Sequence, residues 1–336
     1  MRKRPSSIDV ARLAEVSQAT VSYVLSNRTD KSITDATRAR VIAAADQLGY
    51  TPNRLADGIL RGKSSTIGVL LGYFDHSFYS QLLMGLEEGF TEQNYQILIA
   101  HTRSNVDFGR QQVRMLMEHR VDGIIAIADE STVAELPGWA EDAMRHGVHL
   151  GIIDDLRMAG KVDTVLSDDF EGGRIAVDHL VAAGHQRIAF LGGAGETSSA
   201  KERYRGYCAS LTAHGIEPDP DYTIPSTFLG SKPDIEKLLA LRPAPTAVFA
   251  MSDSLACRVI IATREHGLRV PEDLAVVGYG NPEWADYMGL TSLDQHPHRM
   301  GQAAATRLVA RIQGDESEPQ TEVLAPVLIA RNSTRA

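Results

Sequence analysis

The 336-residue chain has no apolar run of the roughly 18 residues that a membrane-spanning helix needs, so an integral membrane protein is not expected. The basic start, MRKRPSSIDV, is followed by no continuous apolar stretch, and a secretory signal is not expected either. The two cysteines, Cys208 and Cys257, lie far apart without a C-x-x-C partner, so neither a disulfide framework nor a structural zinc site is indicated. These absences favour a cytoplasmic protein with buried, reduced thiols.

The sequence also lacks a recognisable catalytic constellation. GGAGETSSAK, residues 192–201, is glycine-rich, but it has neither the G-K-[ST] ending of a P-loop nor the full G-x-G-x-x-G spacing, and a turn at a strand end is expected. The acidic pairs Asp154–Asp155 and Asp168–Asp169 could suggest metal or acid–base chemistry. No set of nucleophile, base and orienting group converges in the sequence. We therefore expect no catalysis, no cofactor and no metal site.

Charge is distributed unevenly along the chain, which is long enough for two or three domains. Residues 1–65 carry 11 Lys and Arg against 6 Asp and Glu, a net charge of +5. The remainder carries 23 basic against 37 acidic residues, a net charge of −14. A small basic head on an acidic body predicts that the head, and not the body, meets a polyanion.

Helix signals fill the first 50 residues. The predicted helices run from Ser7 to about Ala14, from Ser17 to about Leu25 and from Thr34 to Gly49. A turn around Glu15 joins the first two, and its length is right for a helix-turn-helix. On the second helix we expect an outward face of short polar side chains, which a DNA major groove admits: Ser17, Gln18, Ala19, Ser22 and Tyr23. The alternative is a pair of amphipathic helices in a small bundle without DNA function.

From Thr66 onward, short apolar runs such as TIGVLLG, DGIIAIA, RIAFLGG and LAVVGYG alternate with amphipathic stretches such as GGRIAVDHLVAAG. This alternation predicts parallel sheets with helices on both faces. About four such units precede Asp154 and about four follow Val165, so two doubly wound lobes are expected. Ligands bind at the carboxyl ends of the strands in such sheets, which places the expected site in a cleft between the lobes.

The stretches SSIDVARLAEVSQATVSYVLSN and TRARVIAAADQLGYTPNRLA resemble the head of the LacI/GalR (lactose-repressor) family of bacterial transcriptional regulators. The resemblance continues in order through VDGII, HLVAAGHQRIAFLGG, RYRGY, PTAVFAMSDSLA, GLRVPEDLAVVGYG and LIARNST. It implies an all-α helix-turn-helix head over 1–50, a hinge helix and linker over 51–65, and an α/β effector-binding and dimerisation domain over 66–336. The latter would have two doubly wound parallel-sheet lobes, as in periplasmic binding proteins. The implied N-lobe is about 66–160 plus 295–320, and the C-lobe about 161–294 plus 321–336.

The resemblance implies a repressor that binds a palindromic double-stranded DNA operator as a homodimer. A small polar effector in the cleft, such as a sugar, would change operator affinity by favouring one angle between the lobes. The alternative is a periplasmic-type solute-binding protein without DNA function. That alternative would explain two lobes, but it would need an export signal and would have no use for a basic head.

Carried over from the family, the base readers are Gln18, Ala19 and Tyr23. Tyr23 stands where relatives usually have an Arg that pairs with guanine, so a different operator sequence is expected. Glu15 replaces the usual turn Gly and disfavours a left-handed backbone there. The implied DNA-binding residues are Ser17, Gln18, Ala19, Thr20, Ser22, Tyr23, Asn27, Thr34, Asn53, Arg54, Ala56, Ile59 and Leu60.

The segment TPNRLADGILRG, residues 51–62, resembles the hinge helix, which in relatives forms on DNA and inserts a Leu into the minor groove. Ile59 takes the wedge position, with Leu60 as the alternative, unless Ile59 is a linker residue that packs on the core. Asp57 replaces a cation beside the phosphates, and Gly58 weakens a helix by about 1 kcal/mol relative to Ala. The hinge is therefore expected to order less readily than in relatives.

Implied effector-binding residues come from several strand ends and helix starts: Phe78, Tyr79, Asp154, Arg203, Phe228, Ser252, Asp253, Gly280 and Asn281. An Arg with a carboxylate and an aromatic wall suits a polyhydroxylated molecule, although Phe78 and Phe228 are equally compatible with core packing. Relatives often have Asn where Ser252 stands and Asp where Gly280 stands. A different effector class or a weak effector response is therefore expected, with Asn281 able to compensate for Gly280.

Overall fold

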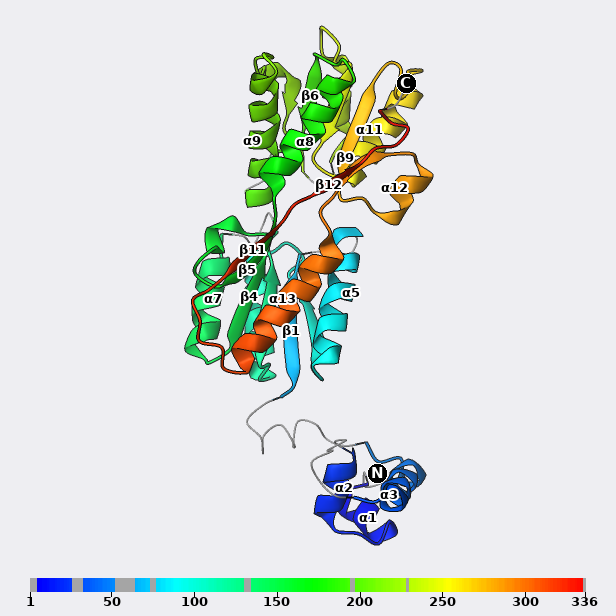
Figure 1. Cartoon of the computed structure of the whole chain (residues 1–336), viewed down its shortest axis with the longest axis vertical. Helices are drawn as coiled ribbons and strands as arrows, with labels where there is room; N and C mark the ends of the chain where they lie inside the picture. Colours follow the sequence, from blue (N-terminus) through cyan, green and yellow to red (C-terminus); the bar gives the residue numbers. More distant parts are fainter. Residues whose placement is uncertain are drawn as a thin grey trace. The chain divides into compact units, whose positions relative to one another are not determined.

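The computed structural model describes residues 5–25, 33–51, 64–72, 77–129, 134–193, 197–227 and 230–334. Its internal contacts divide the chain into two compact units, Met1–Ser64 and Ser65–Ala336. We call the first unit the head and the second the body, and Figure 1 shows the elements of each.

Three helices, α1 (Ser7–Leu13), α2 (Gln18–Leu25) and α3 (Asp35–Leu48), make up the described part of the head. They pack around a small apolar core: Val10, Ala11, Ala14, Val21, Val24, Val41, Ala44 and Ala45. Ser6, and not the predicted Ser7, caps α1, because Ser6 and Asp9 exchange hydrogen bonds in a capping box. The predicted cap Thr34 and the predicted end at Gly49, with φ of 62°, are confirmed for α3.

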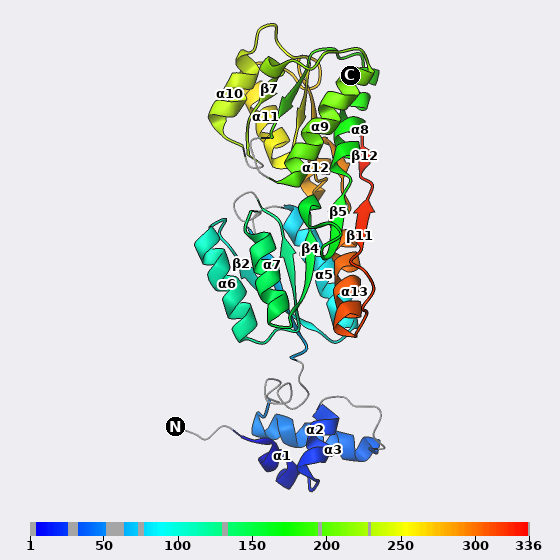
Figure 2. The ribbon, with the colours of Figure 1, turned by 90° about the vertical axis from the view of Figure 1, so that its left-hand side faces the viewer.

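The first lobe of the body, the N-lobe, is a six-stranded parallel sheet in the order β11-β5-β4-β3-β1-β2. Helices α5 and α13 cover one face, and α6 and α7 cover the other (Figure 2). The strands are β1 (Thr66–Leu71), β2 (Gln96–His101), β3 (Gly123–Ile127), β4 (His149–Ile153), β5 (Asp163–Ser167) and β11 (Thr321–Leu324). The helices are α5 (Ser77–Glu92), α6 (Val106–Glu118), α7 (Leu136–Arg145) and α13 (Pro297–Ile312), with a 3₁₀ turn η1 (Leu156–Met158).

The second lobe, the C-lobe, is a six-stranded sheet in the order β12-β10-β9-β8-β6-β7, in which only the pair β10–β12 is antiparallel among the described strands. Helices α8 and α9 pack against each other, and α10 packs against α11. The strands are β6 (Ile188–Leu191), β7 (Thr223–Ile224), β8 (Ala247–Ala250), β9 (Ala275–Tyr279), β10 (Thr291–Asp294) and β12 (Val327–Ile329). The helices are α8 (Asp169–Ala182), α9 (Ser198–Ala213), α10 (Lys232–Ala240), α11 (Asp253–Glu265), α12 (Glu283–Tyr287) and the 3₁₀ turn η2 (Pro220–Tyr222).

Two doubly wound lobes are thus confirmed, but the expected lobe limits are wrong. β5 pairs with β4, and β11 pairs with β5 through Thr321 and Thr164, so both strands belong to the N-lobe sheet. The chain crosses between the lobes three times, from β5 to α8, from β10 to α13 and from β11 to β12 (Figure 1). The N-lobe therefore extends to Ser167 and includes residues 321–324. The apolar runs of the two lobes look alike, and backbone pairing between strands distant in sequence decides which sheet each one joins.

Glycines allow two helix pairs to approach closely. A Cβ on Gly85 of α5 would collide with the carbonyl of His298 at the start of α13. A Cβ on Gly173 of α8 would likewise collide with the carbonyl of Arg203 in α9. The second contact brings the backbone of α9 against α8 where Arg203 faces Asp169.

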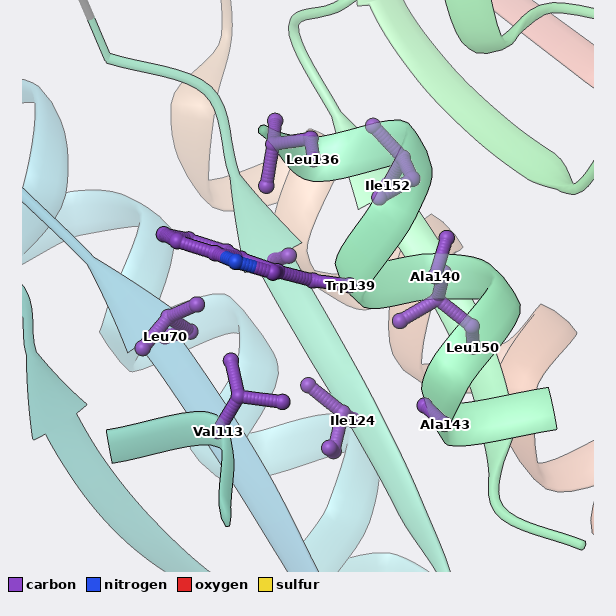
Figure 3. A pocket seen from close by; sticks show the side chains of 10 residues that line it. Leu70, Val113, Ile124, Leu136, Trp139, Ala140, Ala143, Leu150 and Ile152 are labelled. Carbon is purple, nitrogen blue, oxygen red and sulfur yellow. The ribbon is translucent and has the colours of Figure 1, made fainter. Parts of the chain in front are cut away.

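The N-lobe core contains a small apolar cavity beside the indole of Trp139 (Figure 3). Its volume of about 10 Å³ is at the limit for one water molecule. The Trp139 Nε1 atom is buried and has no hydrogen-bond partner among the described residues. Figure 3 shows Leu70, Val113 and Ile124 gathered beside the ring. The cavity is a gap in core packing and is too small for an effector.

Candidate functional site

The head presents a helix-turn-helix whose turn residue, Glu15, has a left-handed backbone conformation. Glu15 lies between α1 and α2 with φ of 53°, in the left-handed region that a side chain disfavours. Ser17 caps α2 by accepting a hydrogen bond from the Thr20 backbone at 3.1 Å, and its hydroxyl lies 2.9 Å from the Thr20 hydroxyl. The cap predicted for the second helix is therefore confirmed.

The exposed side of α2 carries the residues expected to meet DNA. Ser17, Gln18 and Ala19 are exposed, whereas Thr20, Ser22 and Tyr23 are partly buried. On the opposite side Val21 and Val24 are fully buried against α1 and α3. The Gln18 side chain is not independent, because its Nε2 donates to the hydroxyl of Ser7 on α1 at 2.9 Å. The described α2 thus has one apolar face and one polar face, as a recognition helix requires.

The other residues of the expected DNA-binding set lie outside α2 and its cap. Thr34 is exposed, but its hydroxyl accepts from the backbone of Thr37 at 3.3 Å and caps α3. The remaining members of the set lie outside the described residues: Asn27, Asn53, Arg54, Ala56, Ile59 and Leu60, together with Asp57 and Gly58 of the expected hinge. Their roles stay predictions.

In the body, Arg203 of α9 is the centre of a buried polar cluster. It is only 3% exposed, and three of its nitrogens donate hydrogen bonds. Nε donates to Asp169 at 2.8 Å, Nη1 to the carbonyl of Met251 at 2.7 Å, and Nη2 to Gln295 at 3.2 Å. The guanidinium carbon lies 3.6 Å from the ring centroid of Tyr279. Arg203 therefore gathers residues that follow or end β5, β8, β9 and β10.

Asp154 follows β4 and borders this cluster. Loss of hydration and the nearby charge of Asp169 raise the pKa of Asp154 to about 7, although Arg203 opposes the shift. Asp154 has a φ of 68°, and its backbone carbonyl accepts a hydrogen bond from Ser198 at 3.2 Å. The same hydroxyl accepts from the backbone of Leu156 at 3.0 Å. Ser198 at the start of α9 thus ties the C-lobe to the loop after β4 in the N-lobe.

The side chains of Ser252 and Asp253, which follow β8, form hydrogen bonds with other groups of the C-lobe. Ser252 is buried and caps α11 by accepting from the backbone of Leu255 at 3.2 Å. Asp253 is 3% exposed, and its Oδ2 accepts from the backbone of Asn281 at 2.5 Å and from Ser292 at 2.9 Å. Its Oδ1 is buried and has no hydrogen-bond partner within the described part of the chain. Burial raises the pKa of Asp253 to about 7, against the effect of these donors.

Gly280 and Asn281 both have structural roles in the C-lobe. Gly280 has a φ of 132°, and a Cβ there would lie 3.1 Å from Oδ2 of Asp253, so a side chain would be strained and crowded. The Asn281 amide donates to Asp294 at 3.1 Å and accepts from Arg331 at 2.8 Å. Both ends of the Asn281 amide therefore bind to groups of the C-lobe, and its role toward an effector stays a prediction.

The aromatic residues of the expected effector site divide between the core and the undescribed part of the chain. Phe78 is 8% exposed and belongs to the N-lobe core, with its ring 5.5 Å from that of Tyr79 in an edge-to-face contact. Tyr79 is partly exposed. Phe228 lies outside the described residues. Phe78 therefore packs in the N-lobe core, which was the alternative expected for this residue.

Other sequence-based expectations have clear outcomes. Asp168 caps α8 through the backbone of Glu171 at 3.0 Å, and Asp169 pairs with Arg203, so this acidic pair serves structure and the cluster. The glycine-rich stretch begins directly after β6, at Gly192 and Gly193, and leads to α9. Sequence reasoning missed Tyr279 and Gln295 as cluster members. The signal available was their position, since each lies at or just after the end of a mostly buried strand.

Two further features are absent from the described ranges. Within them, no group of three or more His, Cys, Asp and Glu side chains could hold a metal ion. No described helix is both long enough and apolar enough to cross a bilayer.

Comparison with known proteins gives matches along the whole chain. Residues 8–53 match the family described as bacterial regulatory proteins, lacI family, and residues 177–334 match the periplasmic binding protein-like domain. The HTH-type transcriptional repressor PurR of Vibrio atlanticus is 32% identical over 332 residues, covering 97% of this chain and 98% of that protein. PurR of Aliivibrio salmonicida is 30% identical over 332 residues, with 97% of each chain covered.

Solved structures agree with these matches. The lac repressor dimer bound to operator and the anti-inducer ONPF has a TM-score of 0.83 at 28% identity, covering 99% of this chain and 100% of that one. The complex of the transcriptional regulator CelR with cellobiose has a TM-score of 0.74 at 30% identity, covering 98% and 100%. Both PurR relatives are therefore transcriptional repressors and not enzymes.

Proposed function

This chain belongs to the lacI family of bacterial regulatory proteins, and we propose that it represses transcription by binding a palindromic operator as a homodimer. The observation that carries the proposal is the head, a capped helix-turn-helix whose second helix exposes Ser17, Gln18 and Ala19. The head has a net charge of +5 on a chain whose total is −9, which suits a polyanionic partner. A solute-binding protein would leave this head without a purpose. The cytoplasm, where an operator is accessible, is its place of action.

Direct readout is assigned to Gln18, Ala19 and Tyr23, with Ser17, Thr20 and Ser22 nearest the phosphates. A phenol cannot form the two parallel hydrogen bonds that an Arg makes with guanine, so Tyr23 excludes that pairing. A two-fold dimer presents two such helices, which is why the operator is expected to be an inverted repeat.

The effector is assigned to the surroundings of Asp154 and Arg203. Arg203 is enclosed, its charge is paired with Asp169, and two further N–H groups donate to Met251 and Gln295. A guanidinium committed in this way is not available to neutralise an anionic ligand. Asp154 is partly exposed as a residue, and its carboxyl, with a pKa of about 7, can accept or donate a hydrogen bond. The effector class that fits is an uncharged or cationic molecule rich in hydroxyl or amino donors, such as a sugar or an amino sugar.

Coupling between effector and operator follows from the three crossovers. The chain leaves the N-lobe after β5 and after β11 and returns to it after β10, so a ligand that prefers one angle between the lobes changes the orientation of these three connections. In a dimer this alters how two heads can dock together. Such coupling is typically on the order of 1–3 kcal/mol, or about a 5- to 150-fold change in affinity.

The proposal is tested on genomic DNA from the source organism. Full-length protein should retain fragments that share an inverted repeat, and a Gln18→Ala/Tyr23→Ala double variant should not. The retained fragment then serves for anisotropy measurements with three ligand groups: neutral sugars, amino sugars, and phosphorylated or carboxylated sugars. A shift in operator affinity with one of the first two groups is expected. A response to the anionic group alone would contradict the effector class, and no retained fragment would contradict the DNA assignment.

A further inference from the structure

The first residue of α1 contacts the first residue of α2 across the head. Gln18 Nε2 donates to the Ser7 hydroxyl at 2.9 Å, although the two residues are eleven apart in sequence. Gln18 is exposed and Ser7 is partly exposed, so neither is held by burial in the core. A long polar side chain on a surface is ordinarily free to sample several rotamers. This hydrogen bond selects one of them.

Both ends of the bond are attached to backbone that is itself fixed. The capping box between Ser6 and Asp9 sets the start of α1, with hydrogen bonds of 2.9 and 3.4 Å. The Ser17 cap sets the start of α2. Behind them, α1 and α2 share the apolar core of the head. Ser7 is thus held at a defined position beside Gln18, and it is not needed for the cap of its own helix.

The amide chemistry leaves Gln18 competent for base readout. Its NH₂ group has two hydrogens and its Oε1 accepts; Ser7 takes one hydrogen, so one N–H and the oxygen remain. A donor and an acceptor on one amide match N7 and the N6 amino group of adenine in the major groove. A serine hydroxyl at this place holds the amide without competing for the oxygen.

We propose that Ser7 is a positioning residue for Gln18 and that the amide it holds reads an adenine in each operator half-site. This inference rests on the proposed function, in which Gln18 meets the bases. Fixing a rotamer-rich side chain before binding removes an ordering cost that corresponds to about a 2- to 12-fold change in affinity. The gain applies only where Gln18 engages its base, so Ser7 sharpens sequence preference and leaves non-specific DNA binding unchanged.

The experiment compares full-length wild type, Gln18→Ala, Ser7→Ala and Ser7→Thr by selection from a pool of random duplexes. Gln18→Ala should lose an adenine preference at one position of each half-site. Ser7→Ala should weaken the preference at that same position by about 2- to 12-fold, and Ser7→Thr, which keeps the hydroxyl, should restore it. In Ser7→Ala, the affinity for a scrambled duplex and the unfolding temperature of the head should both stay unchanged. Ser6→Ala removes the helix cap and should lower the unfolding temperature of the head.

Each contrary outcome has a distinct meaning. If Gln18→Ala relaxes the base preference at one operator position and Ser7→Ala does not, Ser7 has no positioning role. The inference then fails, while the proposed function stands. If Ser7→Ala relaxes a different position, Ser7 contacts DNA itself and the inference fails. If Gln18→Ala relaxes no position, the assignment of Gln18 as a base reader fails, and the role of Ser7 fails with it. A preference for a base other than adenine would overturn the assigned base.

Discussion

Arg203 and Tyr279 form the closest cation–aromatic contact described in the body, with the guanidinium carbon 3.6 Å from the ring centroid. The same guanidinium pairs with Asp169 at 2.8 Å, and both partners of the ion pair are at most 5% exposed. One buried cation thereby connects α8, α9 and the end of β9. A buried pair of this kind is costly to break from one side, because the remaining charge stays away from water.

We predict that Arg203→Met lowers the free energy of unfolding of the body by about 3–5 kcal/mol, since it leaves Asp169 buried and unpaired. The double variant Arg203→Met/Asp169→Leu should recover a large part of that loss. Urea unfolding followed by tryptophan fluorescence measures both. Arg205→Met is the matched control, because Arg205 lies on the same helix with 64% of its side chain exposed and should cost less than about 1 kcal/mol. Equal effects of the two single substitutions would contradict the prediction.

Asp253 makes the stability of the body depend on pH. Its folded-state pKa of about 7 lies above the ordinary value of 3.8, because burial disfavours the carboxylate. The folded state therefore binds the proton more tightly, and the stability associated with the protonated form is lost as pH rises from about 4 to about 7. Asp253→Asn, which keeps a neutral acceptor, should remove this loss, which is at most about 4 kcal/mol.

Unfolding of wild type and Asp253→Asn at pH 5 and pH 8 measures that difference. The substitution should be more favourable at pH 8 than at pH 5. Asp221→Asn, the same substitution at an exposed position, is the matched control. A pH-independent difference for Asp253→Asn would refute the assignment of a raised pKa to this carboxyl.

The sequence predicted the local elements well because their signals are local. Ser17, Thr34 and Gly49 cap or end helices through atoms within a few residues, and the alternation of apolar and amphipathic stretches determines the class of fold. The residues that surround Arg203 could not be predicted from local sequence in the same way. Asp169, Met251 and Gln295 are 34, 48 and 92 residues away from it, and only the assembled sheets bring them together.

Two departures from the family pattern have backbone or hydrogen-bonding surroundings that residue identity does not reveal. Gly280 looked like a lost ligand contact, but its positive φ and the nearness of Asp253 give it a backbone role. Asn281 looked like a substitute, but its amide is bound by Asp294 and Arg331. Residue identity alone states which groups are present. It does not state which of them are already engaged.

Glu15 carries a conformational cost that glycine would remove. With φ of 53°, its Cβ opposes the left-handed backbone, and Glu15→Gly should stabilise the head by about 1 kcal/mol. Glu15→Ala keeps the Cβ and should give no such gain. Hydrogen exchange of the amides of Val10 and Val41, which are fully buried in the head, measures the local opening free energy. Slower exchange in both variants would show that charge, and not backbone conformation, is responsible.

Two helical glycines of the N-lobe should respond to alanine in opposite directions. A Cβ on Gly109 would lie 2.5 Å from the indole of Trp139, whereas a Cβ on Gly138 would meet nothing within 4 Å. Gly109→Ala should destabilise the body by about 1–3 kcal/mol through overpacking. Gly138→Ala should stabilise it by about 0.5–1 kcal/mol through helix propensity.

The cause of the Gly109 effect can be checked by removing the obstructing atoms. Trp139→Phe shortens the ring, so Gly109→Ala should cost less in that background than in wild type. Thermal unfolding of the four proteins completes the cycle. Additive effects would show that the indole is not what the new methyl group meets.

Operator binding is tested most directly by selection from a pool of random duplexes with the full-length protein, followed by light scattering to measure the oligomeric state on the selected DNA. We predict enrichment of an inverted repeat bound by two copies of the chain. The Gln18→Ala/Tyr23→Ala variant should lose the preference for that repeat. No enriched repeat, with and without a mixture of cell metabolites, would contradict the assignment of this protein as an operator-binding repressor.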